Sequence, residues 1–143
     1  MYEPIRTKSV HSTVGDTVSD FPHRSREEEL DIQLAGHLAA LLAVTDELRA
    51  VAPSGELDAA AGRIAEQVAR LRGGASVVRA GVTRGGRDVA GLHTRALAVA
   101  GRALVVAASR ADTVVAILAA ERMDVHAGAS GGSRELSGAA SRG

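Results

Sequence analysis

Residues 25–51 read SREEELDIQLAGHLAALLAVTDELRAV, and this stretch decides the fold class. Leucine recurs at positions 34, 38, 41 and 48, with Thr45 between the last two. This spacing places all five side chains on one face of a helix. Ser25 and Glu28 form a capping box, in which each side chain satisfies a free backbone amide at the helix start. The stretch therefore predicts an amphipathic helix that begins at Ser25 and ends before Pro53, since the residue before a proline avoids the helical conformation.

Two further helices follow with the same kind of spacing. Ser54 is expected to cap a second helix that ends at Gly73 and Gly74. Its apolar face consists of Leu57, Ala61, Ile64, Val68 and Leu71. Asp88 is expected to cap a longer third helix, whose best apolar face consists of Leu97, Gly101, Leu104, Ala108, Ala111, Val115 and Leu118. We predict an all-α fold, a three-helix antiparallel bundle made of a helical hairpin plus one long helix, with disordered termini.

The domain boundaries follow from changes in composition. Residues 1–24 are polar, contain two prolines, and predict a flexible N-terminal arm. Residues 25–127 form the helical bundle domain, with a glycine-rich linker at 73–87. Residues 128–143 read GASGGSRELSGAASRG, a low-complexity composition that predicts a disordered tail.

Composition excludes several function classes. The 143 residues carry 17 basic and 17 acidic side chains, so the whole chain lacks the basic excess typical of nucleic-acid binding. The absence of cysteine excludes disulfides, cysteine-bound metals and a cysteine nucleophile. The longest apolar stretch, 96–108, is interrupted by Gly101 and Arg102 and is shorter than the ~20 residues that span a bilayer. With no apolar leader near residue 1, we expect a cytoplasmic protein without a membrane partner.

Lys8 is the only lysine, whereas the chain contains sixteen arginines and is rich in alanine, glycine and valine. In this amino-acid composition the chain resembles small uncharacterised all-helical proteins of actinobacteria. The resemblance implies a helical fold and carries neither an activity nor a site residue to this sequence.

The third predicted helix is apolar over a wider arc than two partner helices cover. We therefore expect self-association into a two-fold homodimer, or contact with another protein. The expected interaction surface consists of Leu97, Leu104, Val115 and Leu118, although the same residues are equally compatible with the chain's own core. These features predict a non-enzymatic helical protein–protein interaction or regulatory module.

The linker supports an alternative function. No acidic residue lies between Glu66 and Asp88, and this interval contains Arg79, Arg84 and Arg87. A run of arginines can neutralise phosphates without reading sequence, so these residues are candidate anion-binding groups of a nucleic-acid-associated regulator. No aromatic residue is interleaved for base stacking, which favours a solvated linker instead.

A second alternative depends on two acidic pairs. Glu28 and Asp31, and likewise Glu121 and Asp124, stand three residues apart and share a helix face. Together the four carboxylates could hold Mg²⁺, and related acidic motifs occur in all-helical nucleotide pyrophosphohydrolases of the MazG type. A metal-dependent nucleotide phosphohydrolase of all-α type requires the two pairs to converge. Their positions near helix ends favour solvent-exposed side chains instead.

The remaining candidate groups predict no chemistry. No two of the five histidines have the four-residue spacing of a helical metal site; they are His11, His23, His37, His93 and His126. Ser130 lies in a Gly-x-Ser-x-Gly sequence, but it follows a helix, whereas a nucleophilic serine of this kind needs a strand before it. We therefore predict no catalytic, cofactor-binding or metal-binding residue, and no cofactor.

Overall fold

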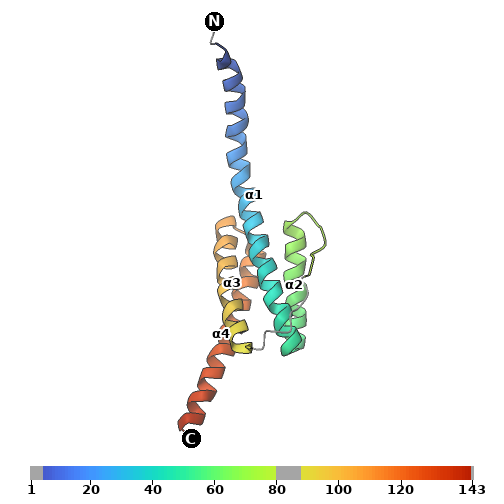
Figure 1. Ribbon diagram of the computed structural model, residues 1–143, viewed down its shortest axis with the longest axis vertical. Coiled ribbons are helices and arrows are strands. Elements are labelled where there is room, and N and C mark those ends of the chain that lie inside the picture. Colours follow the sequence, from blue (N-terminus) through green and yellow to red (C-terminus); the bar gives the residue numbers. More distant parts are fainter. Residues whose placement is uncertain (1–4, 80–87, 143) are drawn as a thin grey trace.

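The computed structural model describes residues 5–79 and 88–142, and within these it describes side chains at 25–79 and 88–130. The described chain forms four helices and contains no strand, which confirms the all-α prediction. The helices are α1 (Ile5–Val51), α2 (Gly55–Leu71), α3 (Val89–Arg110) and α4 (Thr113–Arg142). They lie side by side as a bundle, from which the start of α1 and the end of α4 extend in opposite directions (Figure 1).

The hairpin of α1 and α2 follows the sequence closely. α1 ends at Val51, two residues before Pro53, and the Ser54 hydroxyl accepts a hydrogen bond of 3.1 Å from the Leu57 amide. The predicted apolar face of α1 is completely buried, and Thr45 satisfies its hydroxyl on the Leu41 carbonyl. On α2 the predicted residues are buried except for Leu71, which is partly buried against the core.

The third predicted helix is wrong as a single element, because the chain turns back at Ala111. Ala111 has a φ of 59°, in the left-handed region, and its amide donates to the last turn of α3. The next amide, of Asp112, reaches the Ala107 carbonyl at 2.8 Å, which is the bond pattern of a helix end. The Asp112 carboxylate then accepts from the Val115 amide and caps α4. The three-helix description is therefore corrected to four helices.

The buried face of α3 is also rotated relative to the prediction. Alanines 96, 100, 103 and 107 are fully buried, and each stands one residue before a predicted position, a rotation of about 100°. The prediction followed the larger side chains, such as Leu104. The structure instead places alanines at the centre, because small side chains let neighbouring helices approach closely, and Leu104 packs at their edge.

Within the described residues, 5–24 and 128–142 are helical and differ from the expectation of irregular chain at 1–24 and 128–143. α1 begins at Ile5 rather than at Ser25, and α4 continues to Arg142. The physical reason is helix cooperativity, since extending a helix already held by packing costs far less than starting one. Ser25 is thus an exposed residue inside α1 instead of its cap.

The packing order of the helices determines which of them are neighbours. α1 packs on α2 and on α3, α3 packs on α4, and α2 approaches α4 least closely. α2 ends and α3 begins at opposite ends of the bundle (Figure 1). Among the described helices, α3 is the one long and apolar enough to cross a membrane by length and composition, and here it packs between α1 and α4.

Candidate functional site

The edge between α2 and α4 is closed by charged side chains. Three residues spaced by seven along α2 each meet an opposite charge near or on α4. The pairs are Glu56 with Arg122, Arg63 with Glu121, and Arg70 with Asp112. The last two pairs have N–O distances of 2.9 and 2.8 Å. The other three edges of the bundle are packed much more closely, so this edge differs in depending mainly on ion pairs.

A groove runs along this edge and has an apolar wall. It encloses about 290 Å³ and is lined on the α4 side by Val114, Ile117 and Leu118. Leu118 is buried, but Val114 and Ile117 are 58% and 56% exposed. The structure therefore leaves two large aliphatic side chains of α4 in contact with solvent, one helical turn apart.

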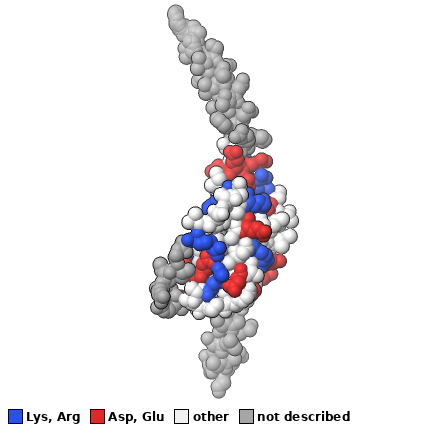
Figure 2. All heavy atoms as spheres, turned by 90° about the vertical axis from the view of Figure 1, so that its right-hand side faces the viewer, with Lys and Arg blue, Asp and Glu red and all other residues white. Residues whose placement is uncertain are grey.

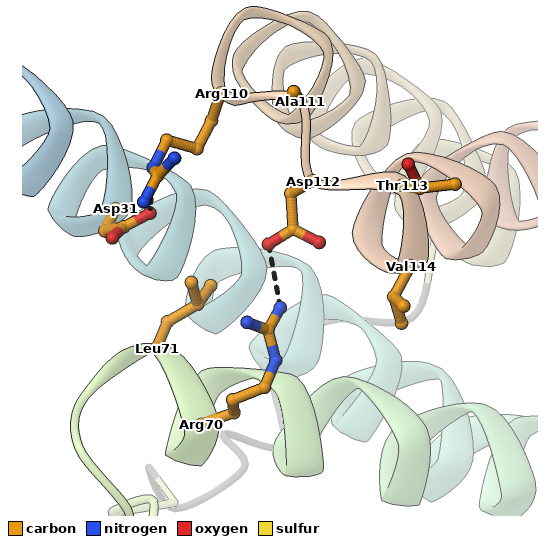
Figure 3. A pocket seen from close by; sticks show the side chains of 8 residues that line it. All are labelled: Asp31, Arg70, Leu71, Arg110, Ala111, Asp112, Thr113 and Val114. Atoms are coloured by element: carbon orange, nitrogen blue, oxygen red, sulfur yellow. Dashed lines mark hydrogen bonds and ion pairs between the residues drawn. The ribbon is translucent and has the colours of Figure 1, made fainter.

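A second hollow, of about 480 Å³, lies at the turn between α3 and α4 (Figure 3). Arg70 and Arg110 both point into this region, and each meets a carboxylate. Arg70 pairs with Asp112, and Arg110 Nε lies 3.0 Å from Asp31 Oδ1. Because both arginines are neutralised within the chain, this hollow offers little attraction for an anion.

A buried polar cluster lies farther along the α2–α4 edge, at the end away from the α3–α4 turn. Arg122 and His126, one turn apart on α4, are both completely buried. The Arg122 guanidinium binds the Glu56 carboxylate of α2, and its Nη2 lies 3.3 Å from His126 Nε2. His126 Nδ1 in turn lies 2.8 Å from the Nδ1 atom of His93 on α3. The cluster thus joins three helices through one continuous chain of contacts.

Burial and charge shift the pKa values in this cluster. Burial, and then the positive charge of Arg122, lower the pKa of His126 to about 4. The same two causes lower the pKa of His93. The hydrogen bond from Arg122 lowers the pKa of Glu56, against the opposing effect of burial. At neutral pH the cluster therefore contains one cation, one carboxylate and two neutral imidazoles, with Arg122 Nε buried and lacking a hydrogen-bond partner.

No protein-family model, curated protein or solved structure matches this chain. Its function therefore has to be inferred from its own side chains. Of the predicted interaction residues, Val115 and Leu118 are buried in the chain's own core, which is the alternative that the sequence left open for them. Leu97 and Leu104 are half-buried, and Leu104 packs against the core.

The linker arginines are placed only in part. The Arg79 guanidinium donates two hydrogen bonds, of 2.8 and 2.9 Å, to the Asp46 carboxylate of α1. Its charge is therefore already paired and is not available to an external anion. Arg84 and Arg87 lie outside the described residues. Burial acts to raise the pKa of Asp46, but the hydrogen bonds from Arg79 and Arg49 outweigh it, and the pKa is lowered. Arg79 therefore ties the described part of the linker to α1.

The acidic pairs lie in different parts of the bundle. Asp31 pairs with Arg110 at the end of α3, whereas Glu121 pairs with Arg63 in the middle of α2. Within the described residues, no three acidic or histidine side chains gather where they could hold a metal ion. The convergence that a metal-dependent phosphohydrolase requires is therefore contradicted for Glu28, Asp31, Glu121 and Asp124.

The other candidates are scattered. His37 is half-buried on α1, and the side chains of His11 and His23 lie outside the described part. Ser130 lies inside α4, so it has no strand-to-helix turn to expose it as a nucleophile. Glu56 and Arg122 were not predicted as site residues. Glu56 could have been found from its seven-residue spacing with Arg63 and Arg70, and Arg122 from its position four residues after the apolar Leu118.

Proposed function

We propose that this chain is a non-enzymatic helical interaction module that pairs with a second copy of itself through the outer face of α4. The observation that carries this proposal is the exposure of Val114 and Ile117 beside the α2–α4 groove. Aliphatic side chains that share one helix face gain free energy when a partner removes them from water.

A second copy fits this face because its pattern is self-complementary. Val114, Ile117, Glu121 and Val125 recur along α4 at steps of three, four and four residues, and Val125 is 39% exposed. Two antiparallel α4 helices related by a two-fold axis level with residues 119 and 120 bring Val114 opposite Val125. Ile117 then meets the aliphatic part of Glu121. A two-fold interface of this kind uses the same patch on both copies.

The charges around this face also favour self-association. Glu121 is already paired with Arg63 of its own chain, so it brings no unpaired charge to the contact. On the α2 side of the molecule, basic and acidic side chains are interspersed below a group of acidic ones (Figure 2), and the net charge of the chain is zero. Two copies therefore approach without long-range repulsion.

The test is the molar mass of the full chain, measured by light scattering over a series of concentrations. The apolar contact is small, so we expect the mass to rise from 14.6 kDa toward twice that value as concentration increases. Ile117→Arg should stay at the monomer mass throughout. Val105→Arg is the matched control, because Val105 is 67% exposed on α3 and does not line the α2–α4 groove.

Two results would contradict the proposal. One is a monomer mass for the unmodified chain at every concentration. The other is loss of the dimer in both variants, which would mean that added charge acts without regard to position.

A further inference from the structure

The buried face of α4 changes character halfway along the helix. It begins with Val115, Leu118 and Ala119, all in the apolar core, and continues with Arg122 and His126. Arginine and histidine are rarely buried completely unless they are paired. The first half of this face is therefore held by apolar packing, and the second half by the polar contacts to Glu56 and His93.

The contacts of this cluster fix where its protons lie. Arginine has only N–H donors, so His126 Nε2 must accept the contact from Arg122. The proton of neutral His126 therefore lies on Nδ1, from which it donates to His93 Nδ1. His93 then carries its own proton on Nε2. Both contacts are made with a single proton on the His126 ring.

An additional proton cannot enter this chain without breaking it. A proton added to His126 Nε2 would face an N–H of Arg122, with two positive charges in contact. A proton added to His93 Nδ1 would face the N–H of His126. If the His126 proton then moved to Nε2, it would again face Arg122. Every arrangement with one more proton loses one of the two hydrogen bonds inside a buried site, where such a loss is costly.

The charged and titratable groups that face His126 come from three helices. They are Arg122 on its own helix, His93 on α3 and Glu56 on α2. Only Glu56 is negative, and its carboxylate is already bound to Arg122. α1 does not pack against the described part of α4, so it supplies no compensating charge.

We propose that uptake of one proton by the His93–His126 pair releases the part of α4 that follows Ala119 from α2 and α3. The bundle then opens at this end in acid while the apolar contacts of Val115 and Leu118 hold the first half of α4 in place. The lowered pKa values of both histidines are consistent with this cost of protonation. The proposal does not rest on self-association, because every contact it uses lies within one chain, but the opening would move Glu121 and Val125 of the proposed dimer face.

Distances between spin labels test the opening, since the chain has no native cysteine to remove. One label pair, Ala59→Cys with Asp124→Cys, spans α2 and the second half of α4 at exposed positions. A reference pair, Ala59→Cys with Ala43→Cys, spans α2 and α1. The Ile117→Arg background keeps distances between copies out of the measurement.

We expect the α2–α4 distance to lengthen between pH 7 and pH 4 while the α1–α2 distance stays constant. His126→Gln should keep the α2–α4 distance of pH 7 at pH 4, because the amide cannot take up a proton and its oxygen still accepts from Arg122 even when His93 is protonated. An unchanged α2–α4 distance in the background chain, or equal lengthening in His126→Gln, would overturn the proposal.

A second measurement needs no variant at His126. Nitrogen chemical shifts of the imidazole rings at pH 7 should show His126 protonated on Nδ1 alone and His93 on Nε2 alone. A proton on His126 Nε2 at pH 7 would overturn the proposal even if His126→Gln failed to fold.

Discussion

At the scale of single residues, the least expected feature is a completely buried arginine whose counter-charge reaches solvent. Arg122 is buried, whereas the side chain of Glu56 is 48% exposed. Removing one partner of a buried pair leaves the other charge without compensation in a medium that solvates it poorly. The cost of a change at Glu56 should therefore reflect the burial of Arg122 more than the exposure of Glu56 itself.

Neutralising Glu56 should destabilise the chain by about 2 kcal/mol, because Arg122 then stays buried without a carboxylate. Glu56→Gln should be compared with Asp58→Asn in urea unfolding at pH 7. Both acids lie in the first turn of α2, so both variants lose the same interaction with the helix dipole. Asp58 pairs with the exposed Arg49, and its loss should cost about 0.5 kcal/mol. Equal costs for the two variants would show that Arg122 does not depend on Glu56.

The pKa of His126 predicts how stability depends on pH. This pKa is about 4 in the folded chain and near 6.5 when unfolded, so between these values the unfolded chain binds more protons. Stability should be complete above pH 6.5 and fall as pH decreases toward 4, by about 3 kcal/mol in all. Unfolding by urea at pH 7, 6 and 5 measures this slope, and His126→Gln should flatten it. An equally steep fall in the variant would assign the effect to other groups.

At the scale of secondary-structure elements, the break between α3 and α4 determines the helix count. Ala111 adopts a left-handed conformation that is unfavourable for any residue with a Cβ atom, and glycine is the usual residue at this position of a helix end. The chain accepts this strain because the turn lets α3 and α4 bury their apolar faces against each other. Asp112 supports the turn by capping α4 and by pairing with Arg70.

Ala111→Gly should stabilise the chain by about 0.5–1 kcal/mol, since it removes the strain of the left-handed conformation. Ala98→Gly is the control, because Ala98 is exposed within the regular part of α3. There glycine should cost about 1 kcal/mol. Thermal unfolding of both variants decides the point, and a loss of stability at both positions would place Ala111 in an ordinary helical conformation.

At the scale of the whole molecule, three edges of the bundle have extensive apolar packing and the fourth has little. α1 and α3 each pack against two helices through buried aliphatic side chains. α2 has one such neighbour, α1, and meets α4 mainly through the ion pairs of Glu56, Arg63 and Arg70. The two exposed pairs, those of Arg63 and Arg70, contribute about 0–1 kcal/mol each. Because this edge has the least apolar packing, we expect it to be the weakest part of the bundle.

Hydrogen exchange should show this difference between helices. Amides of α2 should exchange faster than those of α1 between residues 34 and 48 or of α3 between residues 96 and 107, because α2 separates at a smaller free-energy cost. Added salt should speed exchange in α2 and leave α3 nearly unchanged, since it screens exposed charges. Protection of α2 equal to that of α3 at both salt concentrations would contradict a weak α2–α4 edge.

Local patterns in the sequence were sufficient to predict the helical class, the limits of α2 and the buried faces of α1 and α2. Each rests on local chemistry: leucine spacing, the Ser54 cap, and Pro53 as a barrier to helix. These features need no knowledge of which helices become neighbours. The same local reasoning identified the Asp88 cap of α3, whose carboxylate accepts from the Gly91 amide at 2.9 Å.

Three features depend on tertiary packing: the break at Ala111, the face that α3 buries, and the contacts that join the polar cluster of Glu56, Arg122, His126 and His93. Contacts between α3 and α4 offset the strain at Ala111. Alanines rather than leucines occupy the buried centre of α3, because two neighbouring helices approach closely there. The polar cluster joins residues up to 70 positions apart, since His126 shares it with Glu56. No local pattern encodes such a meeting, because it depends on how three separate helices pack.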